Sequence, residues 1–77
     1  MSQLYSKHFI CVTKVYTNHI NNTITTFNQR VCLDVSSIFS ISETSSGAAY
    51  IEFTDDNRSN IHTAETYDTV IKTLQSF

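Results

Sequence analysis

The spacing of apolar residues changes once along the chain, and this change constrains the fold more than any other feature. Between residues 8 and 63 apolar side chains recur mainly at every second position, the period of a β-strand. From Thr66 the period becomes that of an α-helix, and the apolar positions are Tyr67, Val70, Ile71, Leu74 and Phe77. Thr66 is the predicted N-cap, and Asp68 suits the first turn. A helix this short is unstable alone, so we expect it to pack on the sheet or on a neighbouring subunit.

The strand-like part of the chain contains five or six segments separated by polar turns. Residues 8–17 form the first segment, and residues 23–28 follow a polar cluster that predicts a hairpin with a wide loop. A further strand is expected at residues 31–35. Residues 38–63 are typical of a three-stranded meander, with a positive φ expected at Gly47 in its first turn. The prediction is one α+β domain spanning residues 1–77, in which a small antiparallel sheet of five or six strands carries one C-terminal amphipathic helix.

The size of the chain points to self-association. A domain of 77 residues buries only about 60 to 65% of the surface that its unfolded form exposes. Small domains gain further stability from disulfides, from a metal or from oligomerisation. We expect a homo-oligomer, because the sequence offers little for the first two.

The two cysteines, Cys11 and Cys32, both lie in strand-like segments. The sequence starts with polar residues rather than an apolar secretory core, and no apolar run is long enough to span a bilayer. We therefore expect buried free thiols and a cytoplasmic location, in the host cytoplasm if the protein is viral. A single disulfide is the alternative.

Charge is distributed unevenly along the sequence. Residues 1–33 carry three cations and no carboxylate, whereas the rest of the chain carries seven carboxylates and two cations. One interpretation is a dipolar surface that supports head-to-tail or swapped association. We favour the other interpretation, in which pairing of adjacent strands mixes the two signs.

The residues that could support catalysis or metal binding do not form a convincing set. His8, His19 and His62 lie in separate segments, so no metal site is expected. Cys32, Asp34 and His62 are the one conceivable nucleophilic trio, and a core thiol with a solvated carboxylate is the preferred interpretation. A single glycine excludes a Gly-rich phosphate loop. We expect no enzymatic activity, no catalytic residue and no cofactor.

A family resemblance covers about half of the chain. The segments that carry it are Val35-Ser-Ser-Ile-Phe-Ser-Ile-Ser-Glu43, Tyr50-Ile-Glu-Phe-Thr-Asp55 and Asn60-Ile-His-Thr-Ala-Glu-Thr-Tyr-Asp-Thr-Val-Ile71. Their order resembles the strand, turn, strand, strand and helix pattern of small FlbD/SwrD-type flagellar accessory proteins. The sequence departs from that pattern at Asp56-Asn57 and in about 35 additional residues before the match. The composition, rich in Ser, Thr and Asn, is similar to that of bacteriophage accessory proteins.

Function is expected to depend on surfaces. The first hypothesis is a phage-encoded or bacterial accessory factor that binds a host defence or regulatory protein, and inhibits or regulates it as a homo-oligomer. The second is an oligomer that sequesters a nucleotide-like signal at a subunit interface. The third is a weak nucleic-acid-binding regulator, which is disfavoured because only five cations are present. No membrane partner is expected. The candidate binding residues are Tyr16, Arg30, Tyr50 and Arg58, since tyrosine and arginine suit interfaces.

Overall fold

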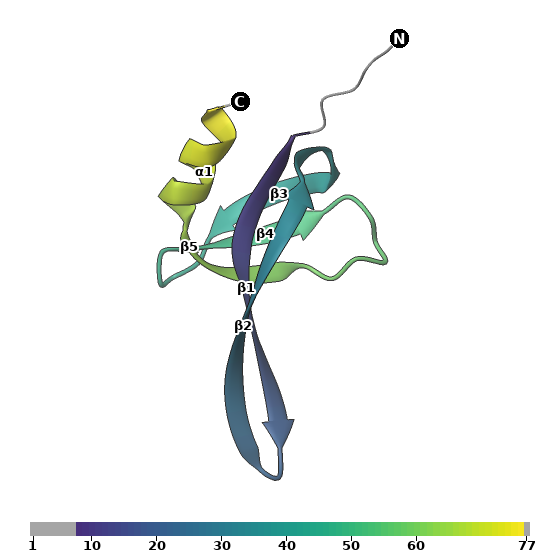
Figure 1. Cartoon of the computed structure of the whole chain (residues 1–77), viewed down its shortest axis with the longest axis vertical. Helices are drawn as coiled ribbons and strands as arrows, with labels where there is room; N and C mark the ends of the chain where they lie inside the picture. Colours follow the sequence, from purple (N-terminus) through teal and green to yellow (C-terminus); the bar gives the residue numbers. More distant parts are fainter. Residues whose placement is uncertain (1–7, 77) are drawn as a thin grey trace.

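The computed structural model describes residues 8–76, which form five strands, one turn of 3₁₀ helix and one α-helix (Figure 1). The strands are β1 (Phe9–Ile20), β2 (Thr23–Asp34), β3 (Ile38–Glu43), β4 (Ala48–Phe53) and β5 (Ile61–Thr66). The 3₁₀ turn η1 (Val35–Ser37) joins β2 to β3, and the helix α1 (Tyr67–Gln75) follows β5 directly. The predicted α+β class, with an antiparallel sheet and a C-terminal helix, is confirmed.

The five strands form one sheet in the order β2-β1-β5-β4-β3, and every neighbouring pair is antiparallel. β1 pairs with β5, so the β1–β2 hairpin joins the β3–β4–β5 meander at β5. Figure 1 shows the β1–β2 hairpin crossing the β3–β4–β5 meander at a steep angle. β2 and β3 are therefore the two edge strands of the sheet.

The core lies between the hairpin and the meander. Because successive side chains of a strand point to opposite faces, every second one points toward the core. The buried apolar residues are Ile10, Val12, Leu33, Ala49, Ile51, Phe53, Ile61 and Val70. Val70 comes from α1, and half-buried Leu74 packs beside it. The helix therefore packs on the sheet of its own chain, which is one of the two expected arrangements. Thr66 is the N-cap, because its hydroxyl accepts from the Thr69 amide at 3.2 Å. Phe77 lies outside the described residues.

The turn of the first hairpin is tighter than predicted. Asn21 and Asn22 have φ angles of 52° and 64°, and they alone connect β1 to β2. Two consecutive positive φ values define the type I′ turn, whose twist matches that of the flanking strands, and Asn tolerates this geometry. The predicted wide loop is therefore wrong. The positive φ expected at Gly47 is confirmed at 88°.

β2 is one continuous strand, although the sequence suggested two. Each β2 residue from Thr23 to Asp34 has a partner on β1, without a register shift. The predicted break at Gln29 and Arg30 does not occur, because neither residue resists extended geometry. This continuity reduces the count to five strands.

The two cysteines form a disulfide, so the expectation of buried free thiols is wrong. Cys11 and Cys32 lie directly opposite each other on β1 and β2, and their Cα atoms are 4.0 Å apart. Both are exposed. The physical reason is alternation: their neighbours Ile10 and Leu33 enter the core, so the cysteines point to the outer face of the sheet.

The far end of the β1–β2 hairpin forms a projecting arm, defined here as residues 16–27. β1 pairs with β5 at Lys14 and Val15, and no further pairing between these strands is seen beyond them. All residues of the arm except half-buried Phe27 are exposed. The arm makes the described part of the molecule elongated, with dimensions of 55 × 25 × 21 Å (Figure 1).

Candidate functional site

The four predicted binding residues do not converge on one site. Tyr16 lies on the core side of the hairpin, at the start of the arm, and stacks on Phe27 with ring centroids 5.5 Å apart. Arg58 lies in the loop between β4 and β5. Arg30 and Tyr50 occupy the outer face of the sheet, where strand alternation places them. The four predicted residues are therefore divided among the core side of the hairpin, the β4–β5 loop and the outer face of the sheet.

Arg30 acts within the sheet. Its Nη1 lies 3.6 Å from Glu65 Oε2 and 3.4 Å from Thr13 Oγ1. Glu65 in turn accepts from the amide and the hydroxyl of Thr13 at 2.7 and 3.0 Å. This network ties β2, β1 and β5 together. The Arg30–Glu65 pair sets a cation of the N-terminal part of the chain against a carboxylate of the C-terminal part, as the expected mixing of charges requires.

Tyr50 and Arg58 also have partners within the chain. The Tyr50 ring lies 4.7 Å from the ring of His62 on β5. The Arg58 guanidinium carbon lies 4.0 Å above the Phe53 ring, and its Nη1 donates to Ser37 Oγ at 3.2 Å. Arg58 therefore attaches its loop to the core and to η1.

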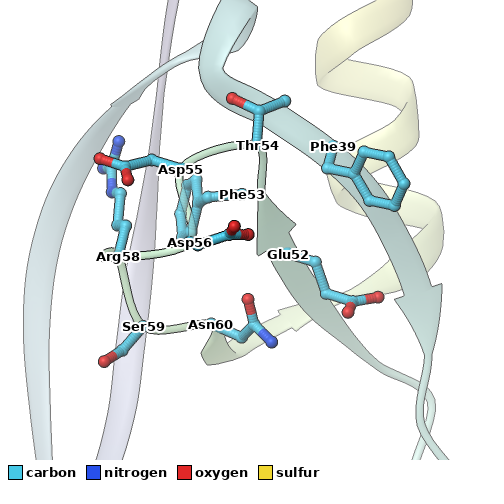
Figure 2. Close-up of a pocket in the computed structure, with 9 residues that line it drawn as sticks. All are labelled: Phe39, Glu52, Phe53, Thr54, Asp55, Asp56, Arg58, Ser59 and Asn60. Carbon is cyan, nitrogen blue, oxygen red and sulfur yellow. The ribbon is translucent and has the colours of Figure 1, made fainter.

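An acidic and aromatic pocket of about 430 Å³ lies between the β3–β4 pair and the loop after β4 (Figure 2). Its lining residues are Phe39, Glu52, Phe53, Thr54, Asp55, Asp56, Arg58, Ser59 and Asn60. Phe39 is 72% exposed, and a shift in the β3–β4 register between Ile38 and Ser40 occurs at its position. We refer to this site as the acidic pocket.

The loop that walls the acidic pocket is held by local hydrogen bonds. Asp55 Oδ1 accepts from the Asn57 amide at 2.9 Å, and the Asp55 carbonyl accepts from the Arg58 amide at 3.0 Å. The Thr54 amide donates to the Ser37 carbonyl at 3.0 Å. The predicted three-stranded meander requires a turn between its second and third strands, but the sequence did not predict the pocket, which also requires β3.

The chemistry of the acidic pocket favours a cationic group. Three carboxylates, from Glu52, Asp55 and Asp56, line it, and Phe39 offers an aromatic face. A lysine or arginine side chain would find both an opposite charge and a ring. Phosphate groups would be repelled. Within residues 8–76 no group of three or more ligand-type side chains could hold a metal ion.

A second groove, of about 590 Å³, lies where β1 leaves β5. It is lined by Lys14, Val15, Tyr16, Thr17, Thr44, Ser45, Ser46, Ala48, Asn60, Ile61, His62 and Thr63. The Lys14 ammonium lies 5.6 Å from the centroid of the Tyr16 ring. A cation, a ring and several hydroxyl groups could hold an anionic ligand with a planar base. We refer to this site as the Lys14 groove.

The nucleophilic trio considered from the sequence does not form. Cys32 is bonded to Cys11, so it offers no thiolate while the disulfide is intact. No helix within residues 8–76 is long and apolar enough to span a bilayer. Comparisons with protein-family models, with curated proteins and with solved structures found no match to this chain. The resemblance to FlbD/SwrD-type proteins therefore stays a prediction.

Proposed function

We propose that this chain is a non-enzymatic interaction protein that binds an extended, basic segment of a host protein along β3. In this proposal it is a phage-encoded or bacterial accessory factor, acts as a homo-oligomer, and inhibits or regulates its partner. The observation that carries the proposal is the position of Phe39, exposed on an edge strand and beside the acidic pocket.

The edge of β3 can accept another strand. β3 pairs with β4 on one side, and no strand within residues 8–76 pairs with its other side. An added segment would gain main-chain hydrogen bonds from every second residue of the six-residue strand β3, since the others bond to β4. Its side chains would alternate between the two faces of the sheet, so every second one could approach Phe39 and the acidic pocket.

Electrostatics favour a basic segment. Glu52 is half-buried and accepts from Ser40 Oγ at 2.8 Å, while Asp55 and Asp56 are exposed. The one cation of the pocket lining, Arg58, stacks on Phe53. A lysine or arginine of the partner would therefore meet uncompensated negative charge.

Affinity capture from host lysate with quantitative mass spectrometry tests this proposal. Phe39→Ser is expected to reduce partner recovery about tenfold, because aromatic anchors contribute most to interfaces of this kind. Asp56→Lys should also reduce partner recovery, because it replaces a negative charge of the acidic pocket with a positive one. Recovery should be judged only for proteins that bind the unmodified chain.

The matched control is Phe9→Ser, which removes an exposed phenylalanine from β1. It should leave partner recovery unchanged. The proposal would be overturned if Phe39→Ser and Phe9→Ser behaved alike, or if a specific partner bound the Asp56→Lys variant as well as the unmodified chain.

The Lys14 groove supports a second candidate function, the sequestration of a nucleotide-like ligand. No ion pair involves Lys14 among the described residues, and Tyr16 provides a ring for stacking. In a thermal-shift screen, a nucleotide that binds the groove should raise the melting temperature of the protein, because a ligand that binds the native state stabilises it. Lys14→Gln should abolish the shift and Lys72→Gln should preserve it. The same shift in both variants, or no shift with any nucleotide, would dismiss this candidate.

The Cys11–Cys32 disulfide indicates the kind of compartment in which the protein works. Disulfides persist in oxidising surroundings and are rare in a reducing cytoplasm. Because Cys11 and Cys32 are exposed, reductants could reach their bond. We propose an oxidising compartment as the working location, in place of the cytoplasmic location expected from the sequence.

A further inference from the structure

The outer edge of β2 lacks the devices that usually prevent strands from pairing between molecules. Natural edge strands are short, bulged, or marked by lysine, proline or inward-pointing charge. β2 spans twelve residues, pairs with β1 without a register shift, and contains no proline, glycine or lysine. Its one cation, Arg30, is drawn across β1 toward Thr13 and Glu65. The outer edge of β2 therefore presents a long run of backbone groups with few charged side chains beside it.

The hydrogen-bonding direction of each β2 residue follows from the β1–β2 register. The Val35 amide donates to the His8 carbonyl, so this pair and every second pair after it bond across the hairpin. The backbone groups of the intervening β2 residues point away from β1. Ile24, Thr26, Asn28 and Arg30 therefore direct their N–H and C=O groups to the open edge.

The arm also lacks a third strand or a covering element among residues 8–76. A two-stranded hairpin without a third strand or a covering element is only marginally stable in water. In the arm, Ile20 is 54% exposed and Ile24 is 64% exposed. Phe27 has Tyr16 as its ring partner and is half-buried. A further strand along β2 would stabilise the ladder and cover part of this surface.

We propose that β2 pairs antiparallel with β2 of a second copy, forming one continuous ten-stranded sheet across a two-fold axis. The self-association belongs to the homo-oligomer of the proposed function, but it uses the edge opposite to β3. Partner binding at β3 and pairing of two copies through β2 can therefore each fail without the other.

Self-complementarity favours a second copy as the occupant. Side chains on one face must meet side chains on the same face, so a two-fold axis passes through a β2 residue that faces itself. At Phe27 the axis sets two aromatic rings opposite each other, a favourable cross-strand pair. Thr26 then faces Asn28 of the second copy, and Arg30 faces Ile24. No like charges meet.

An axis at Phe27 also keeps the second copy away from the loop after β4. Arg58 and Ser59 line a cleft of about 490 Å³ together with Val31 and Cys32, so the C-terminal third of β2 is flanked by this loop. Of the paired residues 23–31, only Val31, at the end of the segment, lines this cleft. Nine residues per copy are fewer than the roughly 20 to 30 of a standard interface, so we expect a micromolar dimer rather than a permanent one.

Sedimentation velocity over a range of concentrations tests the dimer. The unmodified chain should move from a mass near 8.8 kDa toward twice that mass as concentration rises. Ile24→Lys, which sets a second cation opposite Arg30 of the other copy, should weaken dimerisation at least tenfold. Ile20→Lys makes the same change on β1 and should dimerise normally. A monomer at every concentration, or equal effects of the two variants, would overturn the proposal.

Amide hydrogen exchange read by NMR supplies a test that needs no variant. As concentration rises, exchange of Thr26, Asn28 and Arg30 should slow. Phe27 and Gln29, whose amides already face β1, should change much less. Dimerisation without this alternating protection would assign the interface to another surface and overturn the proposal.

Discussion

Reduction of the Cys11–Cys32 disulfide is expected to lower the free energy of unfolding by about 3 kcal/mol. The bond closes a loop with a sequence separation of 21, and a closed loop of this size restricts the unfolded chain by about that amount. A single small core supplies only about 3 to 5 kcal/mol, so the bond carries a large share of the stability. Urea denaturation with and without a reductant measures the difference.

The double variant Cys11→Ser with Cys32→Ser separates the bond from other effects of the reductant. It should match the reduced chain in stability and should not respond to reductant. Equal unfolding midpoints for the oxidised and reduced chain would show that the disulfide contributes nothing. In that case the inference of an oxidising compartment would lose its support.

Ile51→Ala is expected to destabilise the protein by about 2 to 5 kcal/mol, enough to unfold much of the population. Ile51 has no exposed surface and lies at the centre of β4, between β3 and β5. Its removal would leave a cavity in a core that comprises eight buried apolar residues within residues 8–76. Circular dichroism and urea denaturation would measure the loss.

Ile20→Ala is the matched control for this substitution. Ile20 lies in the projecting arm, outside the core, and is 54% exposed. Substitutions of exposed residues usually change stability by less than about 0.5 kcal/mol. If both alanine variants were equally stable, the hydrophobic core described here would be wrong.

Local sequence signals were sufficient for the meander and the helix. The alternation around Ile51 and the turn at Gly47 depend on neighbouring residues, and so does the helical spacing that begins at Tyr67. Each of these features was confirmed. The strand pattern also placed Ile10 and Val12 on one face of β1, which is the buried face.

Features that depend on register could not be predicted in the same way. The pairing of Cys11 with Cys32 requires a two-residue turn at Asn21 and Asn22, whereas the polar residues before it suggested a wide loop. One residue of slippage would have separated the cysteines. A signal was present, because two consecutive asparagines suit a type I′ turn.

The acidic pocket is likewise a product of tertiary structure. Phe39 and the loop residue Asp56 are 17 positions apart, and the β3–β4 pairing brings their segments together. Neither Phe39 nor Asp56 was among the binding residues predicted from the sequence. The uneven charge of the sequence was a partial signal, since three of the seven carboxylates line this pocket.

The two proposed surfaces are compatible in one assembly. β2 and β3 are opposite edges of the same sheet, so a dimer joined through β2 would still present two copies of β3. Two linked sites can raise the apparent affinity for a partner that carries two binding segments. The dimer would then serve partner binding without sharing its surface.

Hydrogen–deuterium exchange of the chain, free and bound to its captured partner, tests whether the partner binds at β3 and the acidic pocket. New protection is expected at Ile38–Glu43 and in the loop of residues 54–60 when the partner binds. Protection of residues 23–31 should depend on the concentration of the chain and not on the partner. Partner-induced protection confined to α1 or to the arm, with β3 unchanged, would show that the partner binds elsewhere and would rule out the β3 interface.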